Sequence, residues 1–578
     1  MSLVYEIQGS LTMDISLSEQ DGVRLAIEGC GHGTLHAIYA SVEEACKRKD
    51  WPGVDLLIIG GDFQSVRNAY DLNCVSMPAK YREMCDFHEY YSGARVAPCL
   101  TIFVGGNHEA SNYLFELYYG GWVAPNIYYM GAANVLRLGP IRIAGMSGIW
   151  KGYNYRKPHH ERLPYNESEL RSVYHTREMD VRKLLQIRTQ VDVGISHDWP
   201  KGVEWKGNSK QLFRYKGFLE EDARSGQLGS AAALEVMNRL RPMYWFSAHL
   251  HCKYAAIIEH EVAYESSTAS LANGNSAVPK NDEEIDLNSD LNDDTGSAAP
   301  TTNADEIELE LEYDIDGVAP IAPGQGLDGA QVNVEDATAG PIVSYEAARA
   351  ALPEAFRRPK PYEPEVVEHP PSIANKTTHF LALDKCMPGK DFLQLTSVPS
   401  VKTTAHERPF KLTYDREWLA ITRAFAIDEP AVFGDPYASM TRAKPQAVYS
   451  SQIDEQSQWL EANLADSDMR IPEEFDAVAP AYDNGNWNLP QYSQVIEYPN
   501  PQTAKFCEML QIENPLAITE EERTARLEAG PKRDPDAERF GSGSRGRGGF
   551  GRGRGGGGDR GRGRGRWRGG GRGRGRGH

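Results

Sequence analysis

The sequence predicts an α/β layered domain in its first half and a smaller α+β domain after it. Between residues 23 and 262, short apolar runs alternate with segments of helical spacing, a pattern typical of α/β proteins. The runs are continuously apolar, as in strands that are buried on both faces. A chain of 578 residues is also too long for one hydrophobic core, so further units are expected after residue 262.

The elements of the first domain follow one another at short intervals. Residues 1–22 are polar and acidic, and we expect a loose N-terminal extension there. A helix is expected at 35–47, where apolar residues recur with helical spacing. Strands are expected at 23–28, 54–59, 100–104, 191–195 and 244–246, together with a hairpin formed by 135–138 and 141–144.

The second half of the chain divides by composition. Residues 281–348 contain no Lys, Arg or His but many Asp and Glu, so we expect a disordered acidic linker over 263–372, most simply a solvated spacer. Strand-like runs at 378–384 and 392–395 and an amphipathic helix at 415–426 predict a small α+β C-terminal domain over 373–430. The Pro-rich, polar residues 431–540 are expected to be mostly disordered, with scattered short helices.

The net charge of −19 hides an asymmetry. Residues 541–578 contain twelve Arg, no Lys and one acidic residue, which gives them +11 and leaves −30 for the rest. Such an Arg-Gly tail is expected to bind RNA or proteins with an affinity that falls with salt, although a purely solubilising tail is the alternative. The eight cysteines form no CxxC pair, and no signal peptide or apolar span is visible, so we expect an intracellular protein without membrane contact.

Five expected strands end at small residues followed by side chains that can bind metals. These side chains are Cys30 and His32, Asp62, Asn107 and His108, His197, and His249 and His251. Singly, each could be a structural His or a helix-capping Asp, but carboxyl ends of strands meet at one sheet edge, where functional groups gather. Imidazole, carboxylate, amide and thiol donors favour Fe, Zn or Mn over Ca or Mg. A bound metal would activate water and neutralise a phosphate, which suits phosphoester hydrolysis.

A second feature is the segment 147–177, in which aromatic and basic residues are interleaved. The candidate RNA contacts are Trp150, Lys151, Tyr153, Tyr155, Arg156, Lys157, Tyr165, Arg171, Tyr174 and Arg177. Splayed bases stack on aromatic rings, and cations meet phosphates. An ordinary exposed polar loop is the alternative interpretation.

With these motifs the sequence resembles the calcineurin-like metallophosphoesterases, whose pattern runs DxH, GD, GNH(D/E), H and GHxH. Two positions depart from it: Ala248 replaces a Gly, and Cys30 replaces the first Asp. The resemblance implies an αββα sandwich of two sheets and two metal pockets that share Asp62. The first pocket would be built by Cys30, His32, Asp62 and His251, and the second by Asp62, Asn107, His197 and His249.

The motifs GDFQSVRN (61–68), GNHEASNYL (106–114), SHDWP (196–200) and SAHLH (247–251) resemble, more specifically, the RNA lariat debranching enzymes, which also carry Cys in the first motif. The likeness covers residues 23–260 and, more faintly, 376–426. It implies hydrolysis of the 2′–5′ phosphodiester bond at intron branch points, so that excised introns become linear for turnover and RNA processing. It also implies Fe, Zn or Mn as cofactor, a lariat recognition loop at 147–177 and a nuclear location.

His108 has no ligand role in this pattern, so we interpret it as the general acid that protonates the leaving 2′ oxygen. Two other functions stay open: a general metallophosphoesterase acting on phosphoproteins or DNA, and an RNA-binding protein on a decayed hydrolase scaffold. Cys30 and the aromatic-basic segment argue against the first, and the complete second pocket argues against the second. The sequence indicates no oligomeric state.

Overall fold

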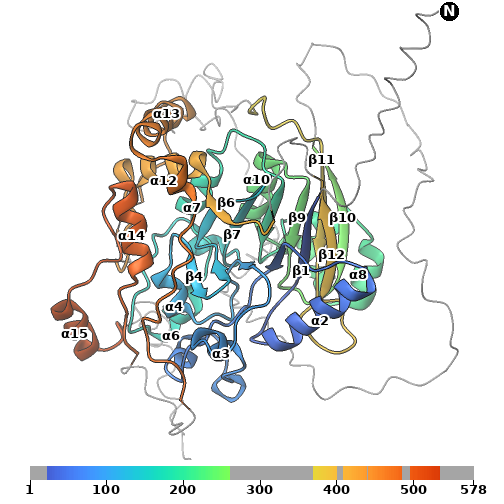
Figure 1. Cartoon of the computed structure of the whole chain (residues 1–578), viewed down its shortest axis with the longest axis horizontal. Coiled ribbons are helices and arrows are strands. Elements are labelled where there is room, and N and C mark those ends of the chain that lie inside the picture. The colour runs from blue at the N-terminus through green and yellow to red at the C-terminus, as the bar shows by residue number, and fades with distance from the viewer. Residues whose placement is uncertain are drawn as a thin grey trace, which may run out of the picture. The chain divides into compact units, whose positions relative to one another are not determined.

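The computed structural model describes residues 22–260, 369–399, 408–435, 437–438, 440–483 and 495–533. The predicted N-terminal extension, acidic linker and Arg-Gly tail lie outside these residues, apart from Gly22 and 369–372. The strands form two sheets (Figure 1). The first contains, in spatial order, β12 (Leu393–Val398), β1 (Val23–Glu28), β2 (Leu56–Ile59), β3 (Thr101–Phe103), β5 (Ile127–Tyr129) and β4 (Gly121–Ala124). The second contains β10 (Tyr254–Glu259), β11 (Thr377–Ala382), β9 (Tyr244–Ser247), β8 (Val193–Ser196), β7 (Ile141–Met146), β6 (Ala133–Leu138) and β13 (Leu412–Tyr414).

The two sheets enclose a shared core because successive residues of a strand point to opposite faces. In β1, Leu25 and Ile27 belong to the core between the sheets, together with Val193 and Ile195 of β8. Ala26, between them in sequence, packs instead with the helices outside the first sheet. The expected burial of both strand faces is therefore confirmed for β1, β2 and β8, and the expected two-sheet sandwich is observed.

Helices cover the outer faces. Outside the first sheet lie α2 (Leu35–Arg48), α3 (Phe87–Tyr91) and α4 (Ser111–Glu116). The core outside the second sheet includes α7 (Glu178–Leu184), α8 (Ser209–Tyr215), α9 (Leu219–Ser225), α10 (Ala231–Leu240), α12 (Arg416–Asp428), α13 (Gln446–Asn463) and α14 (Pro501–Leu510). The remaining elements are α5 (Gly152–Tyr155), α6 (Glu167–Ser172), α15 (Glu520–Ala529) and the 3₁₀ turns η1 (Asp71–Cys74), η2 (Ala79–Tyr81), η3 (Val203–Trp205) and η5 (Asp466–Met469).

The C-terminal segment completes both sheets. β12 pairs antiparallel with β1, β11 lies between β9 and β10, and β13 pairs with β6. The elements expected within 373–430 are present, but they do not form a separate sheet of their own. Their positions are explained by the open edges of β1, β6 and β9, whose backbone groups need hydrogen-bond partners.

The prediction that residues 431–540 are mostly disordered is wrong for the part of them that the structure describes. α13 and α14 bury Tyr449, Ile453, Leu460, Phe506 and Leu510 against the core of the second sheet. Figure 1 shows α12, α13 and α14 gathered on one side of the strands. Widely spaced apolar residues in a polar segment can still make one continuous stripe on a helix. Composition alone therefore does not reveal that these helices pack against the core. In the described ranges, no helix combines the length and apolar character needed to cross a membrane.

Candidate metal centre

The first predicted pocket is assembled in the structure. The ligand atoms of Cys30, His32, Asp62 and His251 all lie within 4.8 Å of one another. His32 Nε2 is 3.1 Å from His251 Nε2 and 3.7 Å from the Asp62 Oδ2. These four side chains follow β1, β2 and β9, so strands from both sheets deliver them to one place.

The second predicted pocket adjoins the first. His197 Nε2 is 3.4 Å from Asp62 Oδ1 and 3.3 Å from Asn107 Oδ1. The ring centroids of His197 and His249 are 5.0 Å apart. The two carboxylate oxygens of Asp62 therefore face different imidazoles, Oδ2 toward His32 and Oδ1 toward His197. Asp62 therefore lies between the two predicted pockets.

The backbone around both pockets is strained. His32, Asp62, His249 and His251 all have positive φ, between 42° and 63°. Residues other than Gly pay about 1–3 kcal/mol for such conformations, which persist only where the surroundings impose them and which concentrate at functional sites.

Glu109 contacts both the loop that carries Asp62 and the loop that carries Asn107. The sequence did not reveal this role, although Glu109 is the last residue of the GNHE motif. Its carboxylate accepts hydrogen bonds from the backbone N–H groups of Phe63 (2.8 Å), Gln64 (2.8 Å) and Gly106 (2.9 Å). Burial and the neighbouring Asp62 raise the pKa of Glu109 to about 7, against the effect of these bonds. Glu109 thus joins the loop that carries Asp62 to the loop that carries Asn107.

The imidazoles of His32 and His249 are uncharged, as metal ligands must be. Burial lowers the pKa of His249 to about 3 and the pKa of His32 to about 4, so both are neutral at pH 7. Burial opposes ionisation of Asp62, but the imidazoles of His197 and His108 outweigh it and hold the pKa of its carboxyl well below its usual range. Neutral His32 and His249 beside an ionised Asp62 have the protonation states that metal ligands require. Burial opposes the charged form of His197, but the carboxylate of Asp62 outweighs it and raises the pKa of His197 above its usual value, so this imidazole would have to lose a proton to bind a metal.

Cys30 fits the donor set only with a cation beside it. Burial and the carboxylate of Asp62 raise the pKa of the Cys30 thiol well above its usual value. Its Sγ accepts a hydrogen bond from the His249 N–H at 3.2 Å. A coordinating thiol is deprotonated by the charge of the metal. Sulfur, imidazole and carboxylate at these distances therefore suit a borderline divalent ion such as Zn or Fe.

His108 stands beside the pockets. Its backbone N–H donates to Asp62 Oδ1 at 2.8 Å, and its ring centroid is 5.8 Å from that of His32. The ring Nδ1 is 3.2 Å from the carbonyl oxygen of Ser76. Since a carbonyl can only accept, Nδ1 carries a hydrogen and Nε2 is left to exchange a proton. The role of general acid stays a prediction.

The segment 147–177 begins at the metal centre. The Trp150 backbone N–H donates to Asp198 Oδ2 at 3.2 Å, next to His197. Of the predicted RNA contacts, Tyr153 is 63% exposed. Arg156 and Arg171 are also exposed, and the half-buried ones are Trp150, Lys151, Tyr155, Lys157 and Tyr174. The Trp150 and Tyr155 rings contact each other with centroids 4.8 Å apart.

Two predicted RNA contacts are placed differently. Tyr165 is buried in a small cluster with Leu163 and Leu170. Arg177 is fully buried, pairs with Glu161 and donates to the carbonyl oxygen of Asn154 at 2.8 Å. The prediction of direct RNA contact is therefore wrong for Tyr165 and Arg177, which stabilise the segment from within. Aromatic and basic residues give the same sequence signal whether they face solvent or the interior.

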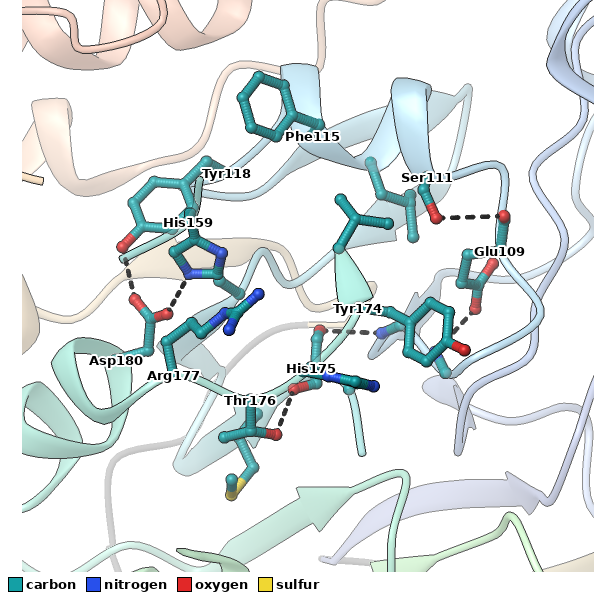
Figure 2. Close-up of a pocket in the computed structure, with 18 of the residues that line it drawn as sticks. Glu109, Ser111, Phe115, Tyr118, His159, Tyr174, His175, Thr176, Arg177 and Asp180 are labelled. Atoms are coloured by element: carbon teal, nitrogen blue, oxygen red, sulfur yellow. Dashed lines mark hydrogen bonds and ion pairs between the residues drawn. The ribbon is translucent and has the colours of Figure 1, made fainter. Parts of the chain in front are cut away.

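A cavity of about 70 Å³ lies between the loop that carries Glu109 and the end of this segment (Figure 2). Tyr174, His175 and Arg177 line one side. At the end away from Glu109, Asp180 accepts hydrogen bonds from the Tyr118 hydroxyl (2.5 Å) and from His159 Nε2 (2.7 Å), as Figure 2 shows. His159 of the segment 147–177 is therefore held by Asp180, which also binds Tyr118.

Comparison with known proteins agrees with this geometry. The calcineurin-like phosphoesterase model matches residues 23–253, and the model of the lariat debranching enzyme C-terminal domain matches residues 375–515. The second match extends well beyond the predicted limit of residue 430.

Lariat debranching enzymes of three distant organisms are similar to this chain. The Schizosaccharomyces pombe enzyme is 36% identical over 492 residues, which cover 84% of this chain and 95% of that protein. The Arabidopsis thaliana enzyme is 35% identical, with 84% and 86% covered. The Homo sapiens enzyme is 35% identical, with 85% and 69% covered. The chain therefore belongs to the lariat debranching enzyme family and is a metal-dependent phosphodiesterase.

Proposed function

We propose that this chain cleaves the 2′–5′ phosphodiester bond at the branch point of lariat RNA. The observation that carries the proposal is the position of Asp62, whose two oxygens face two sets of imidazoles. The segment 147–177 starts beside the same centre, at the Trp150–Asp198 hydrogen bond, and presents Tyr153, Arg156 and Arg171 to solvent. Stacking and phosphate contacts from such a surface would favour an unpaired, branched RNA.

The cofactor we propose is Fe²⁺, Zn²⁺ or Mn²⁺. Cys30, His32, Asp62 and His251 would hold one ion, and Asp62, Asn107, His197 and His249 a second. Such an ion activates water for attack on phosphorus and neutralises charge on the phosphate. The neutral imidazoles of His32 and His249 and the ionised carboxylate of Asp62 support this assignment.

In the proposed mechanism His108 donates a proton from Nε2 to the departing 2′ oxygen. Its Nδ1–H is held by the Ser76 carbonyl oxygen, and its backbone N–H is held by Asp62. These two contacts fix the ring next to the ligand set without making it a ligand. General acid catalysis of this kind typically contributes about 10²–10⁴-fold.

We also propose that this chain acts in intron turnover and RNA processing. Because lariat introns are found in the nucleus, we propose a nuclear location. The Arg-Gly tail, residues 541–578, is proposed to add salt-sensitive contacts to RNA or proteins. Imaging of a tagged chain, with and without the tail, tests both points.

The decisive experiment is a gel assay on a synthetic 2′–5′ branched RNA with and without chelator. We expect cleavage at the branch alone, loss of cleavage with chelator and recovery with Mn²⁺, Fe²⁺ or Zn²⁺. Linear RNA and a phosphoprotein, assayed in parallel, represent the competing substrates. Preferential cleavage of either one would refute the proposal. Deletion of the exposed part of 147–177 should abolish branched-RNA cleavage but spare an aryl phosphodiester.

A further inference from the structure

A second aromatic-basic surface lies outside the segment 147–177. It is formed by η3, α8 and the residues that follow α8. Three aromatic side chains there are exposed: Tyr215 (60%), Phe218 (52%) and Trp205 (45%). A single exposed ring is ordinary, but exposed apolar side chains that gather on one surface are typical of an interaction site.

The same stretch is strongly basic. Residues 201–216 contain five basic side chains, Lys201, Lys206, Lys210, Arg214 and Lys216. All of these are exposed except Lys216, which is half-buried. The one acidic residue of the stretch, Glu204, is only 2% exposed. The solvent-facing charge of this stretch is therefore positive.

Cations lie next to the exposed rings. Lys216 Nζ is 5.6 Å from the Tyr215 ring centroid and 5.9 Å from that of Phe218. Lys390, from the turn between β11 and β12, donates to the Tyr215 hydroxyl at 3.1 Å. Acidic side chains begin again in α9, where Glu220 is paired with Arg224 at 2.6 Å. The positive surface thus ends shortly after Phe218.

One turn connects this surface with the backbone beside the first metal pocket. The turn that carries Lys390 also carries Lys385, which forms an isolated parallel β-bridge with Cys30. Within this turn, the Cys386 N–H donates to the Cys30 carbonyl oxygen at 3.4 Å. The turn that contacts Tyr215 therefore lies beside Cys30, whereas the segment 147–177 begins beside His197.

We propose that Tyr215, Phe218 and Lys216, with Lys385 and Lys390, bind a single-stranded arm of the branched RNA. This inference rests on the proposed function and adds to it a second strand-binding surface. A branch point has three RNA arms, so one recognition loop leaves at least one arm to be held elsewhere. Rings that stack on bases, interleaved with cations that meet phosphates, are the usual platform for single-stranded nucleic acid.

The test compares the full chain with the Tyr215→Ala/Phe218→Ala double variant. The control is Tyr437→Ala, because Tyr437 is 83% exposed and lies in the C-terminal segment. Two branched RNAs are used, one with arms of about eight nucleotides and one trimmed to the nucleotides that adjoin the branch. We expect the double variant to raise KM about tenfold for the long-armed RNA and less than about twofold for the trimmed one. The control should change neither value.

A second measurement separates this inference from the proposed function. Fluorescence anisotropy with a labelled linear single-stranded RNA, in chelator, reports binding without cleavage. Weaker binding by the double variant than by the control supports the surface, even if the parent chain fails to cleave branched RNA. Unchanged binding, or an equal rise of KM for long and trimmed RNA, would overturn it. Lys216→Gln should also lower the salt dependence of binding.

Discussion

Arg162 and Glu497 form a buried ion pair across 335 positions of the sequence. The Arg162 Nε and Nη2 donate to Glu497 Oε1 at 3.0 and 2.8 Å, and the two side chains are only 7% and 8% exposed. Arg162 also donates to the Leu516 carbonyl oxygen at 3.3 Å. Glu497 and Leu516 of the C-terminal region therefore anchor the segment 147–177 through Arg162.

Glu497→Ala should destabilise the protein and loosen this anchor. Removal of one partner leaves the Arg162 charge buried, and such changes cost about 3–5 kcal/mol. We expect a lower denaturation midpoint and a higher KM for branched RNA. Glu474→Ala, which breaks the exposed contact with Lys505, is the matched control and should leave both quantities unchanged. A Glu497→Ala protein with parental stability would show that the pair does not anchor the segment.

His108→Ala should lower kcat on branched RNA by about 10²–10⁴-fold. The loss arises from the missing proton donor, because the hydrogen bond from His108 to the ligand Asp62 comes from the backbone N–H, which the variant keeps. Metal content, measured by inductively coupled plasma spectrometry, should stay at the parental level. A substrate with an activated aryl leaving group needs less protonation, so its hydrolysis should suffer less. Equal loss of metal and activity would contradict the assigned role.

Asp62→Asn should empty both pockets. Asp62 is the residue whose two oxygens face His32 and His197, and an amide offers one oxygen and no charge. We expect metal content near zero and loss of the stabilisation that added metal gives to the parental chain. Cys30→Ser replaces a ligand of the first pocket alone, and its hydroxyl can still accept from the His249 N–H, so this variant should reduce metal content less. If Asp62→Asn retained the parental metal content, the shared carboxylate would have to be reassigned.

Glu109→Gln tests whether the Glu109 carboxylate links the loop that carries Asp62 to the loop that carries Asn107. The carboxylate accepts three backbone N–H groups, whereas an amide would direct its own NH₂ at one or more of these donors. We expect weaker metal binding, seen as a higher metal concentration for half-maximal activity, and a lower kcat. Glu89→Gln, at an exposed pair with Arg95, is the control. Unchanged metal affinity in Glu109→Gln would show that the loops are held by other contacts.

Much of the fold and the ligand set could be predicted from the sequence. Motifs at strand ends located Cys30, Asp62 and His197, because strand ends, glycine-rich loops and donor side chains are local signals. The mode by which β11, β12 and β13 join the sheets depends on pairings between distant residues, and local pattern does not encode them. The same limit explains why Tyr165 and Arg177 were assigned to the surface.

For the surface around Tyr215, the sequence shows the residue types but not their position in the fold. Its aromatic and basic residues were visible in the sequence, but only the contact with Lys390, 175 positions away, connects them to the turn beside Cys30. The interleaved aromatic and basic residues of 147–177 and the family resemblance together predict RNA contacts in that segment. Residues 201–216 matched no known family feature, so their chemistry stood out only once their position was known.

His260 should make stability depend on pH. Burial, with the charges of Arg241 and His369, lowers the pKa of His260 to about 4. The unfolded chain, with a histidine pKa of about 6.5, therefore takes up the proton first as the pH falls. The contribution of neutral His260 is complete above pH ~6.5 and is lost as the pH falls toward ~4. Its Nε2 lies 2.7 Å from the Thr378 hydroxyl, which donates to the Pro242 carbonyl oxygen and so accepts from His260.

In His260→Gln this titration is absent. Between pH ~7.5 and ~4.5, the free energy of unfolding of the parental chain should therefore fall by about 2 kcal/mol more than that of the variant. Each unit of pKa difference corresponds to about 1.36 kcal/mol. Urea denaturation of both proteins across this range measures the difference, in which other titrating groups cancel. His379→Gln, at an exposed histidine on β11, is the control and should not alter the pH profile. A parent-variant difference that stays constant with pH would mean that His260 is not held neutral by its surroundings.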